Sequence, residues 1–112
     1  MSKTPEGAVK DAVHKLLHRK GFIRAGTAKK NWPKEITGWY YMPMKATAMG
    51  VNGIPDFICC WNSKFVAIET KAPGKRGDVS ANQENRISEI RLANGLAVVV
   101  DDAAQLEEIL TS

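Results

Sequence analysis

Two short apolar segments flank the dipeptide Asn62-Ser63, and this pattern constrains the fold more than any other feature of the chain. A two-residue turn between apolar segments is typical of a β-hairpin, and it fixes which residues of the two strands face each other. A symmetric turn makes its two flanking residues pair and, by the same register, places Asp56 opposite Glu69. The sequence therefore predicts two carboxylates facing each other across one hairpin.

These two carboxylates need a partner of opposite charge. Directly opposed side chains in an antiparallel pair have Cβ atoms roughly 4.5–5.5 Å apart, and like charges there destabilise the sheet. A divalent cation would neutralise them. Lys71 projects from the same strand face as Glu69, about 6.7 Å further along. Because Pro55 cannot donate a ladder hydrogen bond and suits the first residue of a strand, we expect this acid, acid and lysine cluster at the rim of a sheet.

The bulk properties indicate one small domain, residues 1–112. The hydrophobic fraction of 44% and the charged fraction of 25% are ordinary for a globular protein, and no apolar run is long enough to span a membrane. The first residues lack an apolar signal region, so we expect a cytoplasmic protein, in the host cytoplasm if its origin is viral. Cys59 and Cys60 should point to opposite strand faces as reduced thiols, and they are too few for a zinc site.

Periodicity and turn residues predict an order of αβββαβα, which indicates an α/β sandwich around a mixed sheet with the second helix as a crossover. The stretch from 22 to 38 is less readable and suggests an exposed loop that holds at most a short strand. Trp32 in that loop is read as a packing anchor in preference to a base-stacking ring. The expected elements are a helix from Thr4 to just before Gly21, strands at 39–44, 57–61 and 65–70, a helix from Ser80 to about Asn94 ended by Gly95, a strand at 96–100, and a short helix after Asp102.

The cluster suits hydrolysis of a phosphodiester. Mg²⁺ prefers oxygen ligands and keeps several waters, so Asp56, Glu69 and the main-chain carbonyl of Thr70 form a suitable ligand set. Lys71 would orient or deprotonate the attacking water, or stabilise the pentacovalent phosphate. The alternative is a surface hairpin with a salt bridge between Glu69 and Lys71. The catalytic interpretation is favoured over the salt bridge, because two acids and a lysine at the ends of buried strands destabilise the fold and would not be expected there without a function.

Basic residues are concentrated in the first part of the chain. Residues 1–45 hold ten Lys or Arg against three acids, whereas 46–112 hold six against nine. Such a distribution suits a sequence-independent phosphate-binding surface, and a solvated helix face with a lysine-rich loop explains it equally well. A basic loop at 72–78 should also lie beside the carboxylates. The DNA-binding candidates are Lys29, Lys30, Lys45, Lys75 and Arg76.

Three features of the chain resemble a known family: GIPD at residues 53–56, FVAIETK at residues 65–71, and Gln83 on the following helix. The chain is similar to the PD-(D/E)xK nuclease superfamily and most closely to its VRR-NUC branch. The resemblance implies a restriction-endonuclease-like αβββαβ core and dependence on Mg²⁺ or Mn²⁺. For short stand-alone viral members, it implies cleavage of branched DNA such as four-way (Holliday) junctions by a homodimer. Residues 25–37 match no motif of the family.

Two further residues enter with the resemblance. Gln83 follows Ser80 at the spacing of a capping box, and it is also a candidate catalytic residue that contacts the phosphate or a metal-bound water. Glu6 shares the apolar stripe of the first helix, so an inward direction would make it an additional metal ligand. Stabilisation of the helix dipole explains Glu6 equally well.

The leading hypothesis is therefore a Mg²⁺- or Mn²⁺-dependent, structure-selective DNA endonuclease of viral or prokaryotic origin. Two alternatives stay open. A nuclease without junction preference would use the same catalytic residues. A nucleic-acid-binding accessory protein would keep the nuclease fold without turnover, and would bind DNA in a salt-sensitive way without cleaving it.

Overall fold

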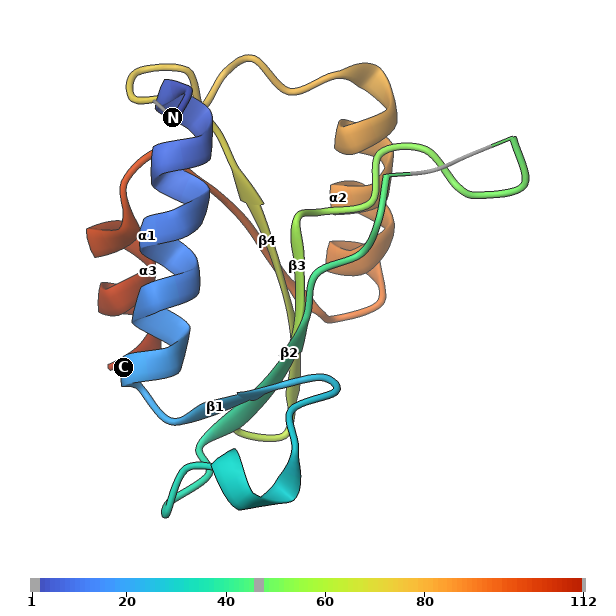
Figure 1. Ribbon diagram of the computed structural model, residues 1–112. Helices are drawn as coiled ribbons and strands as arrows, with labels where there is room; N and C mark the ends of the chain where they lie inside the picture. The colour runs from blue at the N-terminus through green and yellow to red at the C-terminus, as the bar shows by residue number, and fades with distance from the viewer. Residues whose placement is uncertain (1–2, 46–47, 112) are drawn as a thin grey trace.

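The computed structural model describes residues 3–45 and 48–111, and it is built on a five-stranded sheet in the order β1-β2-β3-β4-β5 (Figure 1). The strands β2, β3 and β4 are antiparallel neighbours, whereas β1 runs parallel to β2 and β5 parallel to β4. The predicted mixed sheet with α2 as a parallel crossover is confirmed. The elements are α1 (Pro5–Arg19), β1 (Phe22–Arg24), the 3₁₀ helix η1 (Lys29–Asn31), β2 (Gly38–Tyr41), β3 (Phe57–Trp61), β4 (Lys64–Thr70), α2 (Ala81–Leu92), β5 (Leu96–Val100) and α3 (Ala103–Leu110).

The central hairpin has the register predicted from the sequence. Trp61 pairs with Lys64, and the ladder continues regularly along both strands. Asn62 and Ser63 have φ values of 51° and 61°, which are the positive angles that a type I′ turn requires at both central positions. This turn has the right-handed twist of the flanking strands, so it holds the hairpin in one register.

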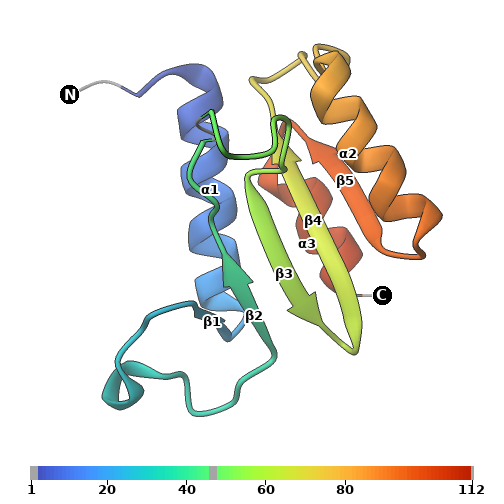
Figure 2. The same ribbon diagram turned by 90° about the vertical axis from the view of Figure 1, so that its right-hand side faces the viewer.

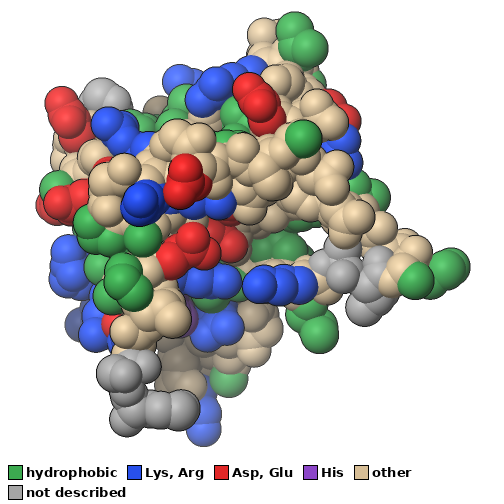
Figure 3. Space-filling model, turned by 90° about the horizontal axis from the view of Figure 1, so that it is seen from above, with side chains coloured by type: hydrophobic (Ala, Val, Ile, Leu, Met, Phe, Trp, Pro, Cys, Tyr) green, Lys and Arg blue, Asp and Glu red, His purple; other side chains and the backbone are tan. Residues whose placement is uncertain are grey.

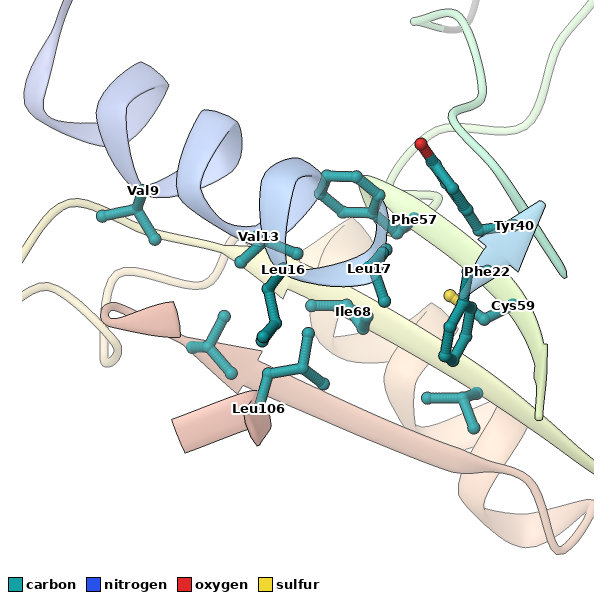
Figure 4. Close-up of a cluster of buried hydrophobic side chains, with 12 residues drawn as sticks. Val9, Val13, Leu16, Leu17, Phe22, Tyr40, Phe57, Cys59, Ile68 and Leu106 are labelled. Atoms are coloured by element: carbon teal, nitrogen blue, oxygen red, sulfur yellow. The ribbon is translucent and has the colours of Figure 1, made fainter. Parts of the chain in front are cut away.

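One face of the sheet is covered by α1 and α3 (Figures 1 and 2). The side chains that α1 contributes are Val9, Val13, Leu16 and Leu17, at the helical spacing predicted from the sequence. They pack with Phe22, Tyr40, Phe57, Cys59, Ile68 and Leu106 in the main core (Figure 4). This packing fixes α1 across β3 and β4, and so decides which of its polar residues reach the end of the hairpin.

The other face of the sheet is only partly covered. Here α2 packs against the β4 and β5 side, where Ile87 contacts Ala67 and Ala97 (Figure 2). The β2 side of this face keeps Trp39 and Tyr41 exposed. None of the helices among the described residues has the length and apolar character that crossing a bilayer requires.

Several boundaries differ from the sequence prediction. The strand expected at 39–44 ends at Tyr41, and residues 22–24 form a strand, β1, that pairs with it. Trp32 anchors its loop through an indole N–H that donates to the Thr27 carbonyl at 3.0 Å, although 43% of the side chain is exposed. Cys59 is buried and Cys60 is exposed, as alternation along β3 predicts.

The end of α2 also differs from the prediction. The left-handed residue after the helix is Asn94, with φ of 69°, instead of Gly95. The amide of Gly95 donates to the carbonyl of Ile90 and that of Asn94 donates to the carbonyl of Arg91. These two bonds form a Schellman motif, in which asparagine is the second choice after glycine for the left-handed position.

Candidate active site

The start of β3, the end of β4 and the start of α2 meet at one end of the sheet, at the top of Figure 1. Seen from above, acidic side chains in the middle of this end are flanked by lysine and arginine side chains (Figure 3). A hollow of about 370 Å³ opens here, lined by residues of α1, of the β2–β3 segment and of the α2 N-terminus. The predicted location at the rim of the sheet is confirmed.

Asp56 is tied to the end of β4 by three hydrogen bonds. Its amide donates to Glu69 Oε1 at 3.3 Å, and its Oδ2 accepts from the amide and the hydroxyl of Thr70 at 2.9 and 2.6 Å. The N–H and C=O of one strand residue point to the same side of the strand. The Thr70 carbonyl, a predicted metal ligand, therefore lies on the side that faces Asp56.

Glu69 is a buried carboxyl beside a second carboxyl. It is only 2% exposed. The pKa of Glu69 is raised from 4.5 to about 8, and burial is the largest cause. The charge of Asp56 and a hydrogen bond with its side chain contribute to the rise, and the charge of Lys71 opposes it. The like-charge conflict predicted from the hairpin register is therefore present in the folded chain.

Lys71 is buried against the same cluster, with 8% of its surface exposed. Its Nζ lies 3.7 Å from Glu69 Oε2 and donates to Gln83 Oε1 at 2.9 Å. The same Gln83 oxygen accepts from the Ser80 amide at 3.0 Å, and Ser80 Oγ accepts from the Gln83 amide at 3.2 Å. The capping-box interpretation of Gln83 is confirmed, and the same side chain also holds the lysine of the cluster. Its contact with the phosphate or a metal-bound water stays a prediction.

Two further lysines line the hollow. Lys10 comes from α1, and its Nζ lies 3.7 Å from Asp56 Oδ1. Lys45 comes from the segment after β2 and is exposed, as its predicted contact with DNA requires. The sequence placed Lys10 only in a general basic surface. No local signal separates it from the other lysines of α1, because the packing of the helix on the sheet decides which of them reaches Asp56.

Other candidates are not brought to the cluster. Glu6 is exposed in the first turn of α1, so its predicted inward direction is not observed. In the described part of the chain, no group of three or more His, Cys, Asp or Glu side chains is placed to hold a metal ion. Lys29 and Lys30 lie in η1, at the opposite end of the sheet from Asp56 (Figures 1 and 2).

The basic loop that follows β4 lies on the active-site end of the molecule. Lys75 and Arg76 are exposed there, as predicted. The loop is attached to the end of β5 by Asp101, whose Oδ2 accepts from the amide of Gly74 at 2.8 Å. The other oxygen of Asp101 lies 3.5 Å from Arg76 Nε. The loop therefore presents two positive side chains beside the end of β4.

The donors fit a hard divalent cation. Two carboxylates and a main-chain carbonyl on the facing side are oxygen ligands, and Mg²⁺ completes such a set with water and substrate. The raised pKa of Glu69 fits as well, because burial and the charge of Asp56 both disfavour its ionised form, and a bound cation would offset both. Comparison with models of protein families, with curated proteins and with solved structures found no match to this chain.

Proposed function

We propose that this protein is a metal-dependent nuclease that hydrolyses phosphodiester bonds in DNA. The observation that carries the proposal is that Glu69 contacts both Asp56 and Lys71 beside a hollow lined by Asp56, Lys10 and Lys45. Acids alone would repel a phosphate and lysines alone would only bind it. The combination provides for both a cation and the anionic substrate.

The residues that would hold the metal are Asp56, Glu69 and the carbonyl of Thr70. When bound, Mg²⁺ or Mn²⁺ supplies Lewis-acid stabilisation of the phosphate and a more acidic water. Asp56 is suited to this role because the Thr70 amide and hydroxyl fix its Oδ2, which leaves Oδ1 directed toward the hollow side where Lys10 lies.

The chain itself provides the positive charges for the reaction. Lys71 is held by Gln83 and Glu69, so its ammonium is a positioned point charge that stabilises the extra negative charge of the pentacovalent phosphate. Lys10 approaches from the α1 side and binds the phosphate there. Gln83 uses its oxygen for Lys71 and Ser80, and its Nε2 amide remains a donor for a phosphate oxygen.

The substrate in this proposal is branched DNA such as a four-way junction, and a homodimer cuts it. The reaction takes place in the cytoplasm, which is that of the host if the protein is viral. Symmetric cleavage of a junction needs two active sites, and one chain carries one such cluster. Two chains must therefore act together. The family resemblance of the GIPD and FVAIETK motifs supports both parts of this statement.

The test is cleavage of a labelled four-way junction with and without Mg²⁺. We expect metal-dependent product from the native chain and none from Asp56→Asn or Lys71→Ala. Lys64→Ala is the matched control, because Lys64 lies at the opposite end of β4 on the surface and its loss should leave cleavage unchanged. Undiminished product from Lys71→Ala would refute the mechanism.

A substrate panel separates the alternatives. Equal cleavage of junctions, duplexes and single strands would remove the junction preference and keep the chemistry. DNA binding without cleavage, together with no Mg²⁺ or Mn²⁺ binding by calorimetry, would identify an accessory protein. Asp56→Asn should still bind DNA, since it removes a negative charge from beside the phosphate.

A further inference from the structure

The β2 strand presents two aromatic rings on the sheet face that α2 leaves uncovered. Trp39 and Tyr41 alternate with buried Tyr40, and 41% and 46% of their surfaces are exposed. Their rings are nearly parallel, with an interplanar angle of 19° and centroids 6.5 Å apart. That separation is close to twice the roughly 3.4 Å spacing of stacked bases. We call these two residues the aromatic pair.

The aromatic pair lies on the same sheet face as Glu69. Tyr41 pairs with Ile58 and Ile58 pairs with Ala67, which precedes Glu69 by two residues and so shares its side of β4. One strand across and two residues along correspond to roughly 8 Å between the Cα atoms of Tyr41 and Asp56. Trp39 continues the same line away from the site. Beyond Tyr41 the chain leads to Met44 and Lys45, which line the active-site hollow.

The size of this face limits what can cover it. Trp39, Tyr41 and Phe65, which lies on the same face two strands away, expose 41%, 46% and 46% of their surfaces. With about 150–250 Å² for a whole aromatic side chain, they present roughly 300 Å² together. A stable dimer buries about 800 Å² on each partner. These three rings alone therefore present much less area than a stable dimer buries, and their area is comparable with that of one or two flat rings.

The chemistry of the face also differs from that of the hollow beside it. Lys10 and Lys45 line the hollow, whereas the residues next to the aromatic pair on β3 are the uncharged Ile58 and Cys60. A nucleic-acid strand has the same division, with charged phosphates on one side and flat bases on the other. Aromatic side chains stack with bases of any sequence.

We propose that the aromatic pair is a stacking site for unpaired nucleobases of the DNA strand whose phosphate enters the active-site hollow. The identity of the ligand as DNA rests on the proposed function. The site makes the enzyme prefer branched or flapped DNA through the unpaired bases that such structures expose, because a base inside a duplex has no free face. Tyr41 takes the base nearest the phosphate in the hollow, and Trp39 takes the next.

The experiment measures binding of labelled single-stranded oligonucleotides in EDTA, so that no cleavage occurs. One oligonucleotide is intact, and the other carries abasic residues with the same phosphates. We expect the intact strand to bind the native chain roughly 5- to 150-fold more tightly, the range that loss of one stacked base gives. This comparison uses the native protein and does not depend on the folding of any variant.

The variants assign the effect to the aromatic pair. Trp39→Ala/Tyr41→Ala should bind both oligonucleotides equally, whereas Tyr41→Phe keeps the ring and should bind as the native chain does. Phe65→Ala is the matched control, because Phe65 has the same exposure as Tyr41 but lies two strands away, on β4. Thermal unfolding shows whether each variant is folded.

Equal affinity of the native chain for intact and abasic strands would overturn the proposal. A preference for the intact strand that survives in Trp39→Ala/Tyr41→Ala would overturn it too. So would a dimer, detected by sedimentation, that this variant converts to monomer without loss of that preference. The experiments also distinguish failure of this proposal from failure of the proposed function. Preference for the intact strand without metal-dependent cleavage supports the stacking site and rejects the nuclease. Cleavage without that preference supports the nuclease and rejects the stacking site.

Discussion

The carboxyl of Glu69 shows how a single side chain couples folding to the proposed chemistry. It is buried beside Asp56, and the pKa of Glu69 therefore rises from 4.5 to about 8. Between these two values the folded chain holds a proton that the unfolded chain has released. The free energy of unfolding must then fall as the pH rises through this range.

We predict that the chain without metal loses stability between pH 5 and pH 8 through Glu69. The loss is at most about 1.4 kcal/mol per pH unit, the value for one proton. Saturating Mg²⁺ should stabilise the protein most near pH 8, where Glu69 ionises most readily and can bind the cation. Urea unfolding at several pH values, with and without Mg²⁺, measures both effects.

Glu69→Gln is the control for this prediction, because the amide keeps the shape and cannot ionise. It should remove the contribution of Glu69 to the pH slope and the stabilisation by Mg²⁺ together. A native-like slope in this variant would show that another group titrates in this range.

At the residue scale, the sequence predicted what depends on local geometry. The pairing of Asp56 with Glu69 follows from the two-residue turn of one hairpin, and it is confirmed. The contact of Lys10 with Asp56 depends on how α1 packs across the sheet. The direction of Glu6 depends on the same packing, which is why its prediction from the apolar stripe was wrong.

At the scale of elements, α2 matters because its first turn holds Lys71 through Gln83. The position of that turn is fixed by Gly53, which precedes β3 and lies against the backbone of α2. A Cβ at Gly53 would come within 2.3 Å of the Asn82 carbonyl carbon, and φ of Gly53 is +86°. Only glycine satisfies both the contact and the angle.

We predict that Gly53→Ala destabilises the protein by more than the roughly 1–2 kcal/mol cost of a left-handed alanine, because α2 must also move. Displacement of α2 should reduce cleavage even under conditions in which the variant remains folded. Gly26→Ala is the matched control: its φ is +87°, and a Cβ there meets nothing within 4 Å. Chemical denaturation and cleavage of both variants measure the difference, and equal losses would contradict the role of the contact.

The elements themselves were largely predictable, since β3 and β5 have the expected bounds and Ser80 caps the start of α2 as expected. The short strand β1 was not assigned with definite bounds because three residues carry too little pattern to separate strand from loop. The left-handed residue that follows α2 was misplaced by one position, at Gly95 instead of Asn94. Asn94 and Gly95 are both acceptable in the left-handed position, and the sequence favours the glycine.

At the scale of the whole molecule, the basic residues divide between two ends of the sheet. Lys45, Lys75 and Arg76 lie at the end that carries Asp56 and Glu69, whereas η1 with its two lysines lies at the other (Figures 1 and 2). The sequence placed Lys75 and Arg76 beside the carboxylates, and it gave no position relative to them for Lys29, Lys30 and Lys45. Charge composition cannot distinguish them, because the chain direction through β1 and β2 decides to which end each loop returns.

This division predicts two different effects on DNA binding. Each phosphate contact contributes about 0.9 to the slope of log affinity against log salt concentration for duplex DNA. Neutralising Lys45, Lys75 and Arg76 should therefore weaken binding and reduce the slope by up to about 2.7. Lys29→Gln/Lys30→Gln removes similar charge from the far end and should leave the slope unchanged. Fluorescence anisotropy titrations over a series of salt concentrations measure both. If the far-end variant changed the slope as much as the near-end variant, the DNA would have to cover both ends, and a single phosphate path through the active-site hollow could not account for binding.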